Sequence, residues 1–313
     1  MKILLTADHH IKLSQKNIPK DWAIERYQNL FKQIQEIEYD IHVVAGDVFD
    51  RLPTLEELAL FYDFVLSCKN TTYIIDGNHC ATKKGETFLS LLTKSVNRLN
   101  DKVQIVTEAT EYDFGTLLPY CKLHKKVIFE TLNKQKPLYT HVRGAIPPHV
   151  APEIDLSLLE DFPVVFAGDL HSHSNTQANI VYPGSPVTTS FHRSLVDTGY
   201  ILIDSSDNSW EWHKFEVPQL IRKTVTSEDE MVKTDYHHTI YELEGSLSSL
   251  NDVKNVELLD KKIVKRSSEA SLILTKEMTV EDELIEFLTY ILEIPDDEVK
   301  HAVGVFRDNI PKT

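Results

Sequence analysis

The 313-residue sequence lacks the features that mark secreted, membrane-spanning and zinc-ribbon proteins. It has three cysteines, at positions 68, 80 and 121, and no two of them are spaced as C-x-x-C. This pattern argues against a disulfide framework or a zinc ribbon and favours a reducing compartment. No apolar run is long enough to cross a bilayer, and the short first run leads directly into polar residues instead of a signal-peptide cleavage site. We therefore expect a cytoplasmic protein without membrane contact.

Positive charge is also scarce. The sequence has 33 Lys and Arg against 48 Asp and Glu, which gives a formal net charge of −15. Proteins that bind DNA through their own surface need Lys and Arg to contact phosphates, so this balance is unfavourable for such binding. A DNA-binding function would need metal ions or a partner protein to provide the positive potential.

Apolar runs alternate with helix-like patterns over the first two thirds of the chain. The runs at 2–7, 41–45, 72–76, 138–140 and 163–167 predict buried strands. Helical periodicity predicts helices at 21–37, 54–68 and 86–99, the second of which begins with a capping box of Thr54 and Glu57. Strand, helix and strand at this spacing are typical of βαβ units. We expect an α/β fold in residues 1–218, with a two-layer mixed β-sheet sandwich flanked by helices.

Pro218 and the polar stretch that follows it predict a domain boundary. In residues 219–313 the sequence pattern predicts strands at 221–226, 238–244 and 272–275 and a helix at 279–293. We expect these elements to form a small α+β domain for capping or partner binding. Two apolar helix faces have alternative interpretations. The helix at 54–68 is either buried or a self-association surface, and the helix at 279–293 either packs on its own sheet or binds a partner.

Five predicted strands end in residue types that ligate metals. One strand that ends in Gly-Asp is explained well enough as a buried strand before a polar turn. Five such ends are not, because core strands have no general reason to finish in ligand residues. Open α/β sheets bind their ligands beyond the carboxyl ends of strands. The candidate metal ligands are Asp8, His10, Asp47, Asn78, His141, Asp169 and His171.

These seven side chains offer oxygen and nitrogen donors and no thiolate. Such donors favour Mn²⁺, Mg²⁺ or Fe²⁺ over a structural zinc ion. Seven donors exceed the usual protein ligands of one metal and suit two ions that share a bridging carboxylate. Two divalent ions about 3.5–4 Å apart can activate a water and stabilise the oxygens of an in-line attack on phosphorus.

The five strand ends resemble the motifs of the calcineurin-like metallophosphoesterases. They read Asp8-x-His10, Gly46-Asp47-x-x-Asp50, Gly77-Asn78-His79, a lone His141, and Gly168-Asp169-x-His171. The later segments 182–186 and 189–191 resemble the SbcD-type exonuclease subunits of that superfamily, most of all the phage-encoded members. The resemblance covers residues 1–218 well, and the C-terminal domain only in placement and size.

The resemblance implies a role for each candidate. Asp8, His10, Asp47 and His171 would hold one metal ion. Asp47 would bridge to a second ion, which Asn78, His141 and Asp169 would also hold. His79 would be the catalytic residue that stabilises the transition state or protonates the leaving oxygen, since histidine titrates near neutral pH. Several other histidines, His192 among them, are expected to be structural or surface residues.

The sequence departs from the family pattern at two positions. Asp169 stands where the family usually has histidine, and this adds negative charge to the metal pair; His173 is an alternative ligand if the register slips. Cys80 stands where the family usually has aspartate. This change affects how His79 is oriented, and it places an oxidation-sensitive thiol beside the centre if that thiol is exposed.

The leading hypothesis is a Mn²⁺-dependent exo- or endonuclease subunit that hydrolyses phosphodiester bonds at DNA ends in recombination or repair. By resemblance it would act as a homodimer with an SbcC-like ATPase of the ABC/SMC type. One alternative is a small-substrate phosphomonoesterase or cyclic-nucleotide phosphodiesterase, which would not need the C-terminal domain. Another is a non-catalytic adaptor of an ATPase, against which the complete set of ligands argues.

Overall fold

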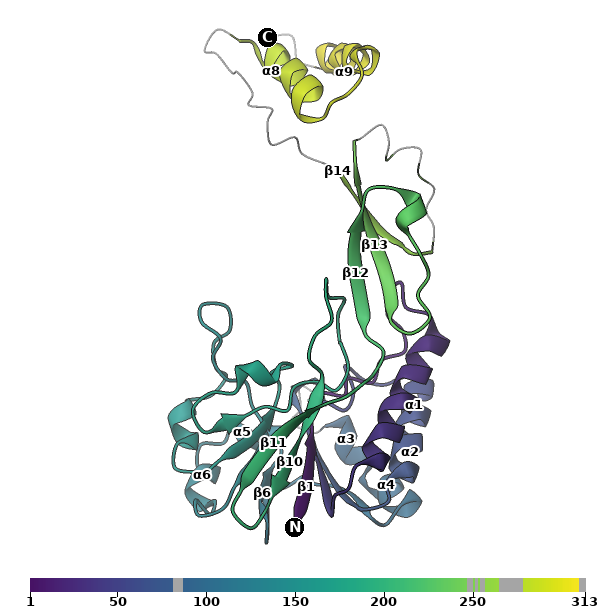
Figure 1. The fold of residues 1–313 in the computed structure, drawn as a ribbon. Helices are drawn as coiled ribbons and strands as arrows, with labels where there is room; N and C mark the ends of the chain where they lie inside the picture. Colours follow the sequence, from purple (N-terminus) through teal and green to yellow (C-terminus); the bar gives the residue numbers. More distant parts are fainter. Residues whose placement is uncertain (81–86, 247–249, 251–252, 254–256, 265–277, 310–313) are drawn as a thin grey trace. The chain divides into compact units, whose positions relative to one another are not determined.

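The structure is a computed structural model that describes residues 1–80, 87–246, 250, 253, 257–264 and 278–309 (Figure 1). The chain divides into two units, Met1–Leu220 and Ile221–Thr313. In the part of the chain described, no helix is both long enough and apolar enough to cross a membrane.

The first unit contains two β-sheets. One has six strands in the order β11-β10-β1-β2-β3-β4, and the other has five in the order β5-β6-β7-β8-β9. In the first sheet β1 (Lys2–Thr6), β2 (Ile41–Ala45), β3 (Thr71–Ile75) and β4 (Val103–Ile105) are parallel, and β10 (Gly199–Asp204) and β11 (Ser209–Lys214) are added antiparallel. In the second, β6 (Gly115–Leu118), β7 (Leu138–His141), β8 (Val165–Gly168) and β9 (Ile180–Val181) are parallel, and β5 (Thr110–Tyr112) is antiparallel to β6.

The two sheets face each other across an apolar core. Side chains alternate between the faces of a strand, so Ile3 and Leu5 of β1 lie in this core while Leu4 packs on the opposite face. Tyr139 and Phe166 are among the residues that the second sheet contributes to this core. Because the central strands are covered on both faces, their sequences are apolar throughout. The predicted two-layer α/β sandwich is therefore confirmed.

Helices cover the outer face of the first sheet (Figure 1). They are α1 (Lys20–Glu36), α2 (Leu55–Ser67), α3 (Phe88–Leu91) and α4 (Thr93–Leu99); α5 (Tyr120–Leu123) and α6 (Ile128–Thr131) pack outside the second sheet. The predicted capping box of α2 is present, with the Thr54 side chain accepting from the Glu57 N–H. The prediction of a single helix at 86–99 is wrong. Two short helices meet at Leu92, whose N–H donates to the Leu89 carbonyl three residues back and tightens the turn.

The second unit combines a small sheet with a helical pair. Its strands β12 (Leu220–Val225), β13 (His238–Gly245) and β14 (Leu259–Val264) lie in the order β12-β13-β14. The helices are α8 (Val280–Glu286), which continues as a π-helix at Phe287–Ile291, and α9 (Asp296–Asn309); Leu288 packs against Val299 and Val303. The strand predicted at 272–275 lies outside the described residues. The sequence did not predict β14 or α9.

Candidate metal centre

The candidate ligands come together beyond the carboxyl ends of strands from both sheets. Asp8 and His10 follow β1, Asp47 follows β2, Asn78 and His79 follow β3, His141 ends β7, and Asp169 and His171 follow β8. Three groups of their ligand atoms lie within 4.8 Å of one another: Asp8, His10 and His171; His10, Asp47 and His79; and Asp8, Asp47 and His141. Residues separated by up to 163 positions thus share one site, because parallel strands end at one edge of a sheet.

The backbone of the site is strained where the ligands leave the strands. Asp8, His10, Asp47 and Asp169 have positive φ values of 56°, 45°, 47° and 102°. Residues other than glycine adopt this region at a cost, and such strain is concentrated at functional sites. All four strained residues are candidate metal ligands, so the strain coincides with the candidate site.

Two glycines allow the segments to approach closely. A Cβ on Gly77 would lie 2.2 Å from Oδ1 of Asp47, and one on Gly46, whose φ is +91°, would lie 2.3 Å from Nδ1 of His141. Any larger residue would displace these side chains. The glycines are therefore required by the space between the ligands as well as by the turn.

Asp47 occupies the middle of the centre. Its Oδ2 is 3.7 Å from Nε2 of His10 and 3.5 Å from Nε2 of His141. On one side, Nε2 of His10 lies 3.0 Å from Nε2 of His171 and 3.8 Å from Oδ1 of Asp8. On the other side, Nε2 of His141 lies 3.2 Å from Oδ1 of Asn78. This arrangement places two donor sets about one carboxylate.

Hydrogen bonds to the far ring nitrogens orient the imidazoles. Nδ1 of His141 donates to the Ala45 carbonyl at 2.9 Å, and Nδ1 of His79 donates to the Asp50 carbonyl. Nδ1 of His171 lies 3.2 Å from Oγ1 of Thr189. For the candidate ligands His141 and His171, a proton on Nδ1 would leave the Nε2 lone pair available to a metal ion, as metal-binding histidines require.

The electrostatics of the centre suit a cation. Burial raises the pKa of Asp8 to about 8 and lowers the pKa of His10 to about 3. Burial would also lower the pKa of His141, but Asp47, Asp8 and Asp169 raise it to about 10. Buried carboxylates in one place are stabilised by a positive neighbour, and divalent ions meet this need together with the available nitrogen donors. The residues therefore fit a metal centre.

Asp169, the first departure from the family pattern, is paired with an arginine. Nε and a terminal nitrogen of Arg143 donate to its carboxylate at 3.0 and 3.1 Å, while its Oδ1 lies 3.8 Å from Nε2 of His141. Asp169 thus faces the side of the centre where Asn78 and His141 lie. His173, the alternative ligand, donates from Nδ1 to the Tyr182 carbonyl at 2.7 Å and stacks on Trp212.

Cys80, the second departure, is fully buried. Burial raises the pKa of its thiol above the ordinary value, which disfavours the reactive thiolate. The side chain of the neighbouring His79 is 41% exposed, and its Nε2 lies 3.9 Å from Oδ2 of Asp47. Its backbone N–H donates to Oδ1 of Asp47 at 3.0 Å, so the position of His79 is fixed without an aspartate at position 80.

Sequence reasoning did not identify the supporting residues Thr189 and Thr6. Oγ1 of Thr6 lies 2.8 Å from Nε2 of both His9 and His42, so a buried polar network supports the loop between Asp8 and His10. Thr189 belongs to a segment that the resemblance singled out, but no local pattern indicates that it contacts His171.

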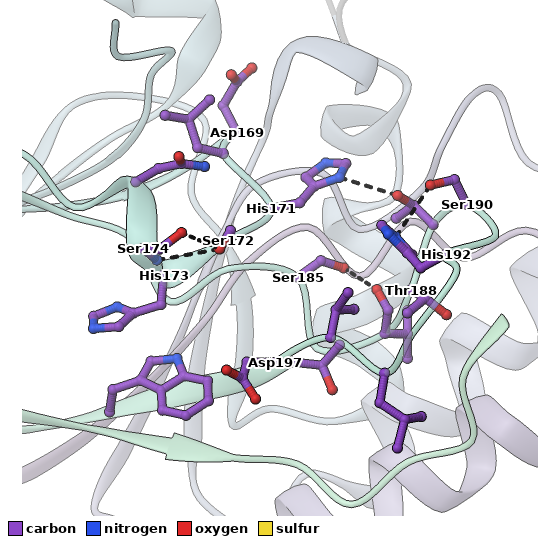
Figure 2. Close-up of a pocket in the computed structure, with 18 of the residues that line it drawn as sticks. Asp169, His171, Ser172, His173, Ser174, Ser185, Thr188, Ser190, His192 and Asp197 are labelled. Atoms are coloured by element: carbon purple, nitrogen blue, oxygen red, sulfur yellow. Dashed lines mark hydrogen bonds between the residues drawn. The ribbon is translucent and has the colours of Figure 1, made fainter. Parts of the chain in front are cut away.

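A pocket of about 780 Å³ opens beside His171. Figure 2 shows His171, Ser190 and His192 on one side of it and His173 on the other. The segments 182–186 and 189–191, noted in the sequence for their resemblance to SbcD-type subunits, supply Ser185, Thr189 and Ser190 to the lining. The pocket therefore adjoins the candidate metal centre directly.

Two facing sheets with candidate Asp, Asn and His ligands at their strand ends are typical of a metallophosphoesterase. The family described as Calcineurin-like phosphoesterase matches residues 1–172, more than half of the chain. The chain belongs to this family, whose members bind divalent metal ions.

The phage T5 relative agrees with this assignment, and two further proteins show similarity to the chain. The chain is 37% identical over 279 residues to "Probable exonuclease subunit 1" of Escherichia phage T5, which covers 85% of each chain. It is 28% identical over 232 residues to "Putative phosphoesterase 244L" of Invertebrate iridescent virus 6, and this match covers 66% of this chain and 77% of the relative. The solved structure of a novel archaeal phosphodiesterase matches with 12% identity and a TM-score of 0.39, over 69% of this chain and 100% of the other.

Proposed function

We propose that the protein is a Mn²⁺-dependent nuclease subunit that hydrolyses phosphodiester bonds at DNA ends. The observation that carries the proposal is the position of Asp47, whose Oδ2 is within 4 Å of Nε2 of both His10 and His141. A carboxylate between two donor sets is what a pair of metal ions requires. The phage T5 relative, which is named an exonuclease subunit, supports DNA as the substrate.

In this proposal the two donor sets hold one ion each. Asp8, His10 and His171 would bind the first, Asn78, His141 and Asp169 the second, and Asp47 both. Bound ions would activate a water molecule and neutralise charge on the scissile phosphate. Asp169 would act as a ligand while Arg143 balances its charge.

His79 is the proposed general acid. Its Nδ1 proton is held by the Asp50 carbonyl, and its partly exposed ring carries Nε2 toward the centre. A proton on Nε2 could pass to the leaving oxygen as the bond to phosphorus breaks. The Asp47 contact to the His79 N–H keeps this donor close to the metal ligands.

Partners form the second part of the proposal. Leu55 and Leu66 on α2 are 85% and 57% exposed, which supports a homodimer formed through this helix. The word subunit in the name of the phage T5 relative supports assembly with another chain, for which we propose an SbcC-like ATPase. Such a complex would work in the cytoplasm of a host cell, in DNA recombination or repair.

Release of nucleotides from end-labelled linear DNA tests the proposal. We expect Mn²⁺-dependent cleavage by the wild type, alone or with the ATPase, and a loss of about 100-fold or more in Asp47→Asn and His79→Ala. Asp101→Asn makes the same chemical change as Asp47→Asn on an exposed turn and should cleave normally. A wild type that hydrolyses small phosphodiesters but not DNA, with or without the ATPase, would remove DNA as the substrate and leave the family assignment intact.

A further inference from the structure

The pocket beside His171 has the size of a small-molecule site. Its volume of about 780 Å³ lies within the range of roughly 300–1,000 Å³ that is usual for such sites. Its lining continues from Asp169 and His171 of the metal centre to Trp212 of β11. A molecule with its phosphate at the centre could therefore extend into this space without a break.

The lining favours an uncharged occupant. Among the described residues that line the pocket, none is Lys or Arg, while Asp169 and Asp197 are acidic. A second phosphate would therefore find no Lys or Arg in the described lining to pair with. The remaining lining combines apolar side chains such as Ile146 and Leu195, hydroxyls such as Ser172 and Thr188, the Asn175 amide and three histidines. Apolar walls with a few polar groups suit a flat heterocycle joined to a sugar.

An aromatic pair on one wall is held in place. His173 stacks on Trp212 with ring centroids 5.5 Å apart and an angle of 19° between the planes. Nε1 of Trp212 donates to the Pro183 carbonyl at 2.9 Å, and Nδ1 of His173 donates to the Tyr182 carbonyl at 2.7 Å. Because Nδ1 is engaged by this bond, Nε2 is the ring nitrogen of His173 that remains for a contact with a base.

Thr189 connects the pocket to the metal centre. Its Oγ1 lies 3.2 Å from Nδ1 of His171, and both residues line the pocket. We propose that this pocket binds one nucleoside of the DNA strand, the base and deoxyribose adjoining the phosphate held at the metal centre. The assignment rests on the proposed nuclease function and names where the enzyme holds its substrate. Stacking on aromatic side chains would make the binding tolerant of base identity.

Two kinds of phosphodiester separate binding in the pocket from chemistry at the metals. The thymidine 5′- and 3′-p-nitrophenyl phosphates carry a nucleoside on one or the other side of the phosphate, whereas bis(p-nitrophenyl) phosphate carries none. His173→Ala removes a stacking ring, and Ser174→Trp fills the pocket from an exposed position. Ser206→Trp, on the exposed turn between β10 and β11, is the matched control.

For at least one thymidine ester, we expect kcat/KM to fall about 10-fold or more in both pocket variants, as the loss of a stacked base predicts. The bis ester should be hydrolysed within about twofold of the wild-type rate, and the control should match the wild type on every substrate. Equal losses on the thymidine and bis esters, or no loss on either thymidine ester, would overturn the pocket assignment.

The same assays distinguish failure of this inference from failure of the proposed function. Cleavage of DNA by the wild type, without selective loss on a thymidine ester in the variants, would refute the pocket alone. Wild type that never cleaves DNA would refute the nuclease proposal. If no ester is hydrolysed, equilibrium dialysis of labelled thymidine 5′-monophosphate decides: the pocket assignment requires binding by the wild type and at least about 10-fold weaker binding by Ser174→Trp.

Discussion

Arg143 and Asp169 form a bidentate ion pair at the edge of the candidate metal centre, with N–O distances of 3.0 and 3.1 Å. The pair lies where the family usually has a neutral histidine, so the extra negative charge of Asp169 is accompanied by a positive one. Arg143 is held in turn by its own N–H, which donates to Glu153 at 2.8 Å. Charge and orientation at this position therefore depend on a residue two positions beyond His141.

We expect Arg143→Ala to weaken binding of one of the two proposed Mn²⁺ ions by about 10- to 100-fold, because the proposed ligand Asp169 loses the partner that orients it. Arg143→Lys keeps the charge but loses the fork of donors, and should recover only part of the affinity. Electron paramagnetic resonance of free Mn²⁺ during a titration measures both sites. Arg98→Ala, on an exposed face of α4, is the control, and two unchanged sites in Arg143→Ala would contradict the prediction.

Thr189 orients His171 from the pocket side, at 3.2 Å. Thr189→Val has nearly the same shape but no hydroxyl, so Nδ1 of His171 loses its acceptor. We expect the other Mn²⁺ ion to bind about 10- to 100-fold more weakly, and Thr189→Ser to restore the affinity. The same titration measures this effect; equal weakening in the valine and serine variants would show that the hydroxyl is not the cause.

Gly77 and Gly304 provide a matched pair of glycine-to-alanine changes. A Cβ at Gly77 would lie 2.2 Å from Oδ1 of Asp47. Among the described residues, and apart from the backbone of its own helix, no atom lies within 4 Å of a Cβ at Gly304 in α9. Gly77→Ala should abolish two-site Mn²⁺ binding or destabilise the first unit by about 1–3 kcal/mol, because Asp47 must move. Gly304→Ala should be neutral or stabilise its helix by up to about 1 kcal/mol. Metal titration and urea unfolding of both variants check the contrast; normal binding and stability in Gly77→Ala would disprove it.

The sequence predicted those parts of the fold that local patterns encode. Apolar runs marked β1, β2, β3, β7 and β8, since strands buried on both faces are apolar throughout. The spacing of Thr54 and Glu57 predicted the start of α2, because a capping box is a contact three residues apart. The ligand-rich strand ends predicted that these residues would lie near one another.

Contacts between distant segments were beyond such reasoning. Arg143 and Asp169 are 26 positions apart, and Thr189 and His171 are 18 apart. No periodicity links these pairs, because the contact exists only once the segments are folded together. The same holds for β14, where the charged residues Asp260, Lys261 and Lys262 give no apolar pattern that would predict a strand. Pairing with β13 stabilises this strand.

Glu57 provides a prediction about acid stability. Its buried carboxylate accepts from the Leu13 N–H at 2.7 Å, the Thr54 N–H at 2.8 Å and the Arg51 guanidinium at 2.7 and 3.0 Å. Burial alone would raise the pKa of Glu57, but these donors lower it from 4.5 to about 2. The ionised form is thus favoured in the folded state. Its contribution to stability is complete above pH 4.5 and is lost as the pH falls toward 2.

Glu57→Gln should therefore lower the free energy of unfolding near neutral pH by about 2–4 kcal/mol, because Arg51 loses its partner and the charged bonds disappear. The difference from the wild type should shrink as the pH falls from 4.5 toward 2, the interval in which wild-type Glu57 takes up its proton. Urea unfolding of both proteins at neutral pH and at several points in this interval measures the difference. Glu36→Gln, whose side chain is 63% exposed, should change stability by less than about 0.5 kcal/mol. A deficit in Glu57→Gln that stays constant across this pH range would mean that packing, and not the charge of Glu57, holds α2 to the segment that follows Asp50.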